Sequence, residues 1–142
     1  RWCIEELGMG QQVRQLITIS TPHQGTWTTR LGIGSPRRDM MIGSPVVRLF
    51  KTAPPAPRYA TIWSDCDEIV TPPQFSLLND RDGNRVFTRQ FRGVSHLAIL
   101  QERKVAELVA RLLEHPRAWD KSLDDQNSYD EDLDDEELEV ED

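Results

Sequence analysis

The sequence predicts an α/β fold with a largely parallel sheet of about three strands. Short apolar stretches alternate with turn-forming or helical segments, and such alternation favours parallel strands joined by crossovers. The first stretch is β-branched and apolar at consecutive positions, which is typical of a strand covered on both faces. The longest amphipathic pattern follows the last strand, as expected for a helix that packs on the sheet. Three strands are few for this architecture, so we expect part of a larger sheet.

The first helix and the first strand are expected at residues 1–8 and 13–20. The segment RWCIEELG is predicted to be the end of a longer helix, and Gly8 stands where glycine commonly ends one. The segment VRQLITIS is the predicted strand, and a turn-forming segment follows it at 21–26. The apolar face of the helix would consist of Cys3, Ile4 and Leu7.

Residues 27–57 separate the first two strands and are rich in Gly, Pro and Arg. An insertion of this length favours a lid or a binding loop. Within it, Ser44 is expected to cap a helix whose first residue is Pro45. Its apolar residues would either contact a substrate or pack within the lid, and they are Trp27, Leu31, Ile33, Met40, Met41 and Phe50.

The second strand, residues 58–64, ends at a cluster of acids within the segment TIWSDCDEIVTP. Asp65, Asp67 and Glu68 follow an apolar and aromatic run. Open α/β sheets place their binding and catalytic groups at the carboxyl ends of the strands. The acid cluster is therefore the first candidate for a functional site.

A third strand at 85–91 is expected nearer an edge of the sheet, after turn-forming residues at 79–84. The loop at 93–96 ends this strand and carries His96. The last helix is predicted from apolar residues near 3.6 spacing, with Pro116 ending it. These residues are Leu97, Leu100, Val105, Leu108, Val109, Leu112 and Leu113.

Charge is distributed unevenly along the 142 residues, whose formal net charge is −7. Residues 120–142 contain 13 of the 24 acidic residues and one of the 17 basic residues, a net charge of −12, which leaves +5 for residues 1–119. A like-charge block with few apolar residues is predicted to be disordered. We therefore expect one ordered domain at 1–119 and an acidic tail at 120–142, which either increases solubility or binds a basic partner.

Several function classes find no support in the sequence. The arginines are scattered and not interleaved with aromatic residues, so a nucleic-acid partner is not indicated. No apolar stretch is long enough to span a membrane, and no glycine loop of the phosphate-binding or dinucleotide-binding kind occurs. His23, Cys66, Asp67 and His96 lack the spacing of metal ligands. We expect neither a metal nor a cofactor.

The two cysteines, Cys3 and Cys66, do not identify a cellular compartment. A disulfide between them has no support from the sequence, and the acids that flank Cys66 disfavour its thiolate and make it a poor nucleophile. No signal peptide is visible, and the chain begins at Arg1 within a predicted helix, so we expect residues to have preceded it. The location is left open.

Two side chains of complementary chemistry are expected at the same edge of the sheet. Asp67 follows the second strand and His96 follows the third, and the carboxyl ends of parallel strands meet at one edge. A histidine acts as a general base when a carboxylate on its other ring nitrogen fixes its tautomer. The pair therefore suggests two members of a nucleophilic triad. A loop-capping role for each residue is the alternative.

Four segments, in order, resemble bacterial lipases and esterases of the α/β-hydrolase superfamily. LITISTPHQGT (16–26) resembles the strand and loop just past the nucleophile elbow, and RDMMIGSPVVRLF (38–50) resembles the lid segment. IWSDCDEIVTP (62–72) resembles the acid loop, and GVSHLAIL (93–100) resembles the histidine loop. The order of acid and then histidine agrees with the superfamily arrangement.

The resemblance implies that residues 1–119 are the C-terminal portion of a hydrolase domain, with a lid insertion at about 27–57. Asp67 would be the triad acid and His96 the catalytic base. The other two acids of the cluster, Asp65 and Glu68, would be solvated neighbours. His23 would occupy a structural position beside the lid, without a chemical role.

The motif that carries the nucleophile in this superfamily, G-x-S-x-G, is absent from the 142 residues. Ser95 does not supply it, because Gly93 lies two residues before it but Leu97 lies two residues after. We therefore expect the serine, the first strands and the oxyanion loop upstream of Arg1, and no activity from the chain as given. The implied activity is hydrolysis of ester or lipid substrates by a lipase or esterase. The alternatives are an acyltransferase or another hydrolase of this fold, and a non-catalytic remnant or binding scaffold.

Overall fold

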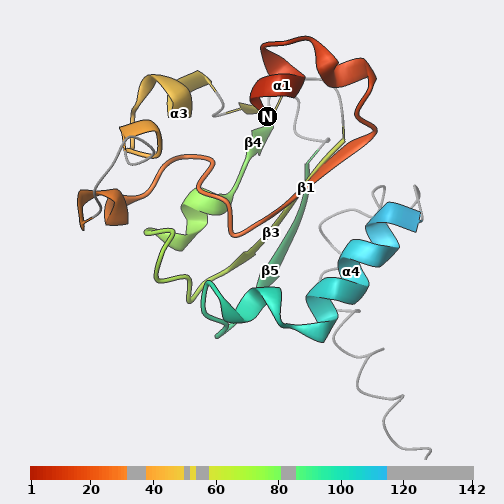
Figure 1. The fold of residues 1–142 in the computed structure, drawn as a ribbon. Helices are drawn as coiled ribbons and strands as arrows, with labels where there is room; N and C mark the ends of the chain where they lie inside the picture. The colour runs from red at the N-terminus through yellow and green to blue at the C-terminus, as the bar shows by residue number, and fades with distance from the viewer. Residues whose placement is uncertain (32–37, 50–51, 54–57, 81–85, 115–142) are drawn as a thin grey trace, which may run out of the picture.

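The computed structural model describes residues 1–31, 38–49, 52–53, 58–80 and 86–114 (Figure 1). Its helices are α1 (Trp2–Glu5), α3 (Pro45–Leu49) and α4 (Arg103–Glu114), with short 3₁₀ turns η1 (Met9–Gln11), η2 (Trp27–Leu31), η3 (Pro73–Ser76) and η4 (Ala98–Leu100). Its strands are β1 (Gln15–Ile19), β2 (Thr52–Ala53), β3 (Arg58–Ser64), β4 (Asn79–Asp80) and β5 (Val86–Phe91). The expected acidic tail at 120–142 and the helix stop at Pro116 lie outside the described residues.

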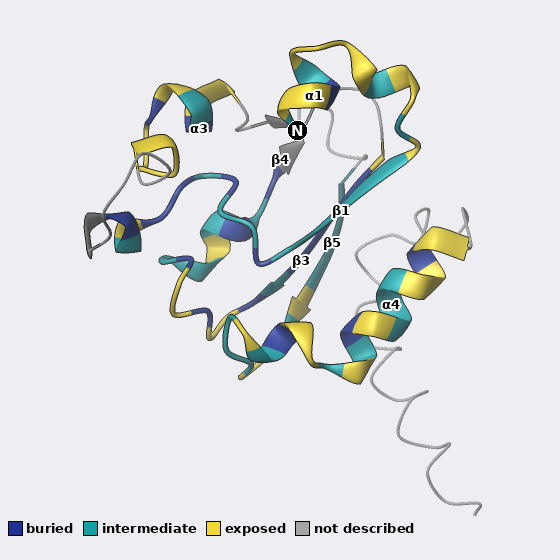
Figure 2. Ribbon diagram, viewed as in Figure 1, coloured by how far each residue is buried: buried dark blue, intermediate teal, exposed yellow. Residues whose placement is uncertain are grey.

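Three strands form one parallel sheet in the order β1-β3-β5, which confirms an α/β fold with a parallel sheet. Ile19 pairs with Ile62 in β3, and Ile62 pairs with Arg89 in β5, so β3 lies in the centre. Most of β3 is buried, as Figure 2 shows. Its side chains alternate between two faces of the sheet, because successive residues of a strand point in opposite directions.

The first strand differs from its prediction. All five residues of β1 are half-buried rather than fully covered, since among the described strands only β3 pairs with it. The third strand, β5, also has only β3 as a neighbour in this part of the chain, and it is half-buried along most of its length. The position of β5 agrees with the strand expected nearer an edge.

Helix α4 covers one face of the sheet, while the segment that carries α3 lies on the opposite side (Figure 1). On the α4 face, Ile62, Ile99 and Val105 form the buried core, and half-buried residues of β1, β5 and α4 pack around them. On the other face, Tyr59 and Leu78 pack with Leu16 and Val86. The sheet therefore has cover on both sides of its central strand.

The start of the last helix was predicted wrongly. Helix α4 begins at Arg103, and the preceding turn η4 places Ile99 in the core with none of its surface exposed. Leu97 and Leu100 point outward instead, with 63% and 62% of their surfaces exposed. The two leucines matched the helical spacing, but a separate 3₁₀ turn changes which residue faces the sheet. Leu113, also assigned to the seam, is exposed.

The N-terminal helix is shorter than predicted. Helix α1 ends at Glu5, and of the expected apolar face only Ile4 is buried, whereas Cys3 and Leu7 are exposed. Gly8 adopts a left-handed conformation with φ of 69°, three residues after the helix ends, and opens η1. Arg1 lies over the ring of Tyr59, with 5.7 Å between the guanidinium carbon and the ring centre.

Within the insertion, the predicted helix cap is confirmed. The Ser44 hydroxyl accepts a hydrogen bond from the Val47 amide at 3.1 Å, and Pro45 is the first residue of α3. A second, two-stranded sheet was not predicted. Asn79 and Asp80, expected in a turn, form β4, which pairs in parallel with β2.

The apolar residues of the insertion have different outcomes. Ile33 and Phe50 lie outside the described residues, and the side chain of Leu31 is also outside them. Trp27, Met40 and Met41 are exposed, so they are not buried within the insertion. A role for 27–57 as a lid stays a prediction.

Candidate active site

Asp67 lies three residues beyond the end of β3, at the carboxyl edge of the sheet, and only 4% of its surface is exposed. One carboxylate oxygen, Oδ1, accepts hydrogen bonds from the backbone amides of Ile69 at 2.9 Å and Val70 at 2.7 Å. This is the local arrangement of an Asp that closes a turn onto its own following residues. It fixes the carboxylate and leaves Oδ2 directed at another partner.

That partner is His96, from the loop after β5. Its Nδ1 lies 2.8 Å from Oδ2 of Asp67, so the structure brings together the two residues that the sequence selected. An ionised carboxylate can only accept, so Nδ1 carries the proton and donates it, and Nε2 of the neutral ring keeps its lone pair. Among the described residues, none makes a hydrogen bond to Nε2, and the side chain is 22% exposed.

The environment of Asp67 favours its ionised form. Burial of the carboxylate acts in the opposite direction and is the largest single contribution, but the hydrogen bonds from His96, Val70 and Ile69 together outweigh it. The pKa of Asp67 is therefore held below its ordinary value. An ionised Asp67 can orient the His96 ring and stabilise its protonated form.

The two acids that flank Asp67 were expected to be solvated neighbours. Both side chains are exposed, but each carboxylate also accepts a hydrogen bond from the backbone of another loop. Asp65 accepts a hydrogen bond from the Gly93 amide at 2.9 Å, and Glu68 accepts one from the His96 amide at 3.0 Å. The Gly93 amide is the main cause that lowers the pKa of Asp65. Sequence spacing gave no sign of these contacts, because they join two loops about 28 residues apart.

Ser95 precedes His96 in the chain, and its hydroxyl accepts a hydrogen bond from the Ala98 amide at 3.4 Å, at the start of η4. It serves as a turn residue.

Ser20, which the sequence did not single out, follows β1 in a left-handed conformation with φ of 45° and is buried. Its hydroxyl makes no hydrogen bond with the described residues.

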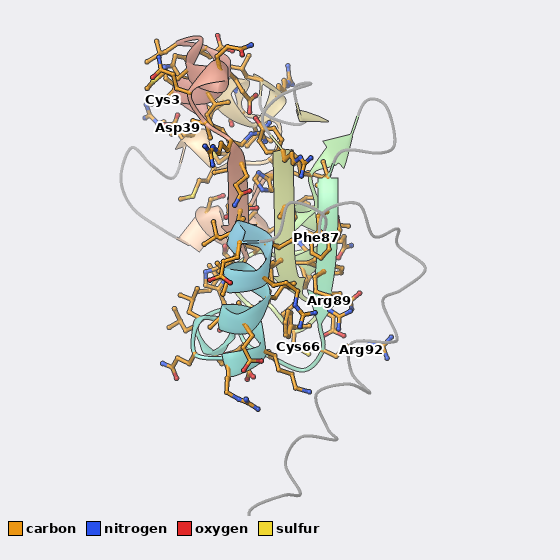
Figure 3. All side chains as sticks on the ribbon, turned by 90° about the vertical axis from the view of Figure 1, so that its right-hand side faces the viewer. Cys3, Asp39, Cys66, Phe87, Arg89 and Arg92 are labelled. Carbon is orange, nitrogen blue, oxygen red and sulfur yellow. The ribbon has the colours of Figure 1, made fainter. Side chains whose placement is uncertain are left out.

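The two cysteines are free, exposed and at opposite ends of the molecule, as Figure 3 shows. A disulfide between Cys3 and Cys66 is therefore excluded by their separation. The end that carries Cys66 also carries Arg89 and Arg92 in this view.

His23 is only 5% exposed and lies in a chain of hydrogen bonds separate from His96. The Thr18 hydroxyl donates to the carbonyl of Ala60 and lies 3.0 Å from Nε2 of His23, so Nε2 carries the proton. Nδ1 then accepts from the Arg1 guanidinium at 3.3 Å. This tautomer is the reverse of that of His96. Burial, followed by the positive charge of the Arg1 guanidinium, lowers the pKa of His23 to about 3.

This environment predicts that His23 stays neutral well into the acid range. Below its ordinary pKa of 6.5 the unfolded chain binds a proton that the folded chain excludes, so acidification from pH 6.5 toward 3 destabilises the fold. The expected loss is about 1.4 kcal/mol per pH unit, and it should be absent from His23→Gln. Measurement of the His23 ring shifts by NMR between pH 8 and 4.5 checks this prediction. Titration of the ring near pH 6.5 would contradict it.

No group of three or more His, Cys, Asp or Glu residues in the described ranges is arranged to hold a metal ion. Among these ranges there is likewise no helix with the length and hydropathy needed to cross a membrane. Neither a scan against models of protein families nor a search of curated proteins finds a match to this chain.

Proposed function

We propose that this chain supplies the acid and the base of a serine hydrolase that acts on carboxylic esters, of the lipase or esterase type. The observation that carries the proposal is the Nδ1–Oδ2 distance of 2.8 Å between His96 and a buried Asp67. The carboxylate is held by two backbone amides, and Nε2 of the ring is left without a bonding partner among the described residues. A histidine held in this way is suited to remove a proton from a hydroxyl group.

In the proposed reaction, Nε2 of His96 takes the proton of a serine hydroxyl as its oxygen attacks the ester carbonyl. The imidazolium that forms is stabilised by the Asp67 carboxylate. It then returns the proton to the alcohol as the ester C–O bond breaks, leaving an acyl group on the serine. A water molecule, deprotonated by His96, then attacks the acyl carbonyl. His96 returns that proton to the serine oxygen as its bond to the acyl carbon breaks, which releases the carboxylic acid and restores the serine.

The proposal assigns the nucleophile to a segment outside these 142 residues, since the sequence contains no G-x-S-x-G. Ser95 does not fit that motif, because Leu97 rather than a glycine lies two residues after it. It is also the direct neighbour of His96 in the chain, a poor position from which to reach the Nε2 side of that ring.

Exposed apolar residues in three segments that hydrogen bonds connect around Thr26 support an apolar acyl group in the substrate. Trp27 donates its backbone amide to Thr71, Thr28 bonds the carbonyl of Ile69, and the Thr26 amide bonds the carbonyl of Met40. These bonds connect residues 26–28 to Met40 and to residues 69–71, and each of these three segments exposes apolar side chains. The exposed residues are Trp27, Met40, Met41, Ile42 and Ile69.

The gene sequence directly upstream of Arg1 tests the proposal. We expect an in-frame G-x-S-x-G, and the joined protein should hydrolyse p-nitrophenyl esters and react covalently with a fluorophosphonate probe. Acyl transfer to an alcohol in preference to water would identify an acyltransferase. A start codon with no such motif before it would instead favour the non-catalytic remnant.

A further inference from the structure

We propose that Asp65 and Glu68 are positioning residues, which hold the loop that carries His96 (residues 93–96, the histidine loop) against the acid loop (residues 64–68). This inference rests on the proposed function, because it concerns how the His96 ring is kept on Asp67. It changes the role of both acids, which the sequence pattern assigned to solvent.

Four residues of the acid loop bond the histidine loop through their side chains. Ser64 donates its hydroxyl to the carbonyl of Val94, and Asp65 accepts from the amide of Gly93. The other two contacts reach the same residue: Asp67 holds the ring of His96, and Glu68 holds its backbone amide. The ring and the backbone of His96 are therefore fixed by different carboxylates.

Such a two-point attachment matters because the histidine loop has little regular structure of its own. Gly93 adopts a left-handed conformation with φ of 71°, and the next regular element is the short turn η4. A ring bonded only through Nδ1 can still pivot about that bond when its backbone moves. The bond from the His96 amide to Glu68 restricts this pivot and sets the direction in which Nε2 points.

The contact to Asp65 holds the opposite end of the loop. Oδ1 of Asp65 accepts a hydrogen bond from the Gly93 amide at 2.9 Å, and Oδ2 lies 3.4 Å from the side-chain amide of Gln90. The backbone amide of Asp65 donates to the carbonyl of Phe91. These bonds tie the end of β5 to the end of β3. The loop is thus anchored where it leaves the strand and again at its catalytic residue.

Amide substitutions separate the hydrogen bonds from the charges. Glu68→Gln and Asp65→Asn keep a carbonyl oxygen that can accept from the same amides, whereas Glu68→Ala and Asp65→Ala remove the acceptor. Asp39→Ala provides a matched control, since Asp39 is an exposed acid at the far end of the molecule from Cys66 (Figure 3).

The experiment is NMR of the present chain with labelled histidine, at neutral pH. In the wild type we expect a low-field Nδ1–H proton from His96 that exchanges slowly with water, and a protected His96 backbone amide. In Glu68→Ala the Nδ1–H signal should broaden or vanish, and exchange of the His96 amide should accelerate about tenfold. Asp65→Ala should accelerate exchange of the Gly93 amide in the same way. Glu68→Gln should restore the Nδ1–H signal, and Asp39→Ala should leave both signals unchanged.

The results distinguish this inference from the proposed function. If the wild type shows the Nδ1–H proton, and Glu68→Ala and Asp65→Ala retain it with unchanged amide exchange, the positioning role is wrong. The Asp67–His96 pair then stands. Lower thermal stability of those variants with an intact Nδ1–H signal would also reject positioning in favour of a structural role. If the wild type itself lacks the signal, the pair does not form, and both the inference and the observation behind the proposed function fall.

Discussion

If the proposed upstream serine exists, replacing His96 with alanine in the joined protein is expected to lower kcat/KM for p-nitrophenyl esters by about 10⁴- to 10⁶-fold. Without the imidazole, no group at this position takes the proton from the serine or returns it to the leaving alcohol. The main loss should appear in kcat rather than KM, because the ring acts on the proton in transfer and not on the bound ester.

Asp67→Asn is the sharper companion variant. The carbonyl oxygen of the introduced amide can still accept from the amides of Ile69 and Val70, so the loop should keep its shape. The NH₂ group of that amide, however, would face Nδ1 and favour the tautomer with the proton on Nε2, which cannot act as a base. We expect a loss of about 10⁴-fold in kcat. Asp39→Ala is the control and should keep full activity. Wild-type rates in His96→Ala would refute the assignment of the base.

The pairing of Asp67 with His96 was predictable because it follows from strand order. Parallel strands place their carboxyl ends at one edge, so residues just beyond two neighbouring strands come close whatever the details of the loops. The choice of Asp67 over Asp65 depended on the resemblance to lipases. The structure gives the physical difference: Asp67 is buried and bonds the His96 ring, while Asp65 is exposed and bonds a backbone amide.

The contacts that hold the site were not predictable from spacing. The roles of Glu68 and Asp65 depend on the backbone path of the histidine loop, and a charged residue beside a turn is most often solvated.

The same limit applies to the helix seam, where Leu97 and Leu100 fitted the helical period. The 3₁₀ turn η4 overrode that period and turned Ile99 toward the sheet. Pairing of β2 with β4 involves only two residues from each strand, too few to form an alternating pattern.

Gly25 joins the insertion to the sheet, and its replacement by alanine is expected to destabilise the fold by about 2–5 kcal/mol. Two causes add. Its φ of 85° lies in the left-handed region, which side chains other than glycine rarely adopt. A Cβ atom there would also lie 2.9 Å from the Cα and the nitrogen of Ile42 and from the carbonyl oxygen of Met40. These are all backbone atoms, so no side-chain rotation relieves the contact.

Gly43→Ala separates the two causes. Gly43 also has a positive φ, 75°, and belongs to the same insertion, but the nearest atom to an added Cβ is the end of the Arg48 side chain at 3.9 Å. Gly43→Ala should therefore lower the free energy of unfolding by about 1–2 kcal/mol, which is the cost of the left-handed conformation alone. Denaturant unfolding of both variants gives the difference, and equal losses would show that the close approach of Gly25 to Ile42 contributes nothing.

The position of Gly25 connects this loss to the candidate site. The next residue, Thr26, donates its amide to Met40, while its hydroxyl donates to the carbonyl of Ile69 and accepts from the amide of Thr71. Displacing the backbone around Ile42 would pull on Thr26 and, through it, on the turn that Asp67 closes. Hydrogen exchange in Gly25→Ala should therefore accelerate at the Ile69 and Thr71 amides as well as in residues 38–44. Acceleration confined to 38–44 would show that the insertion moves independently of residues 69–71.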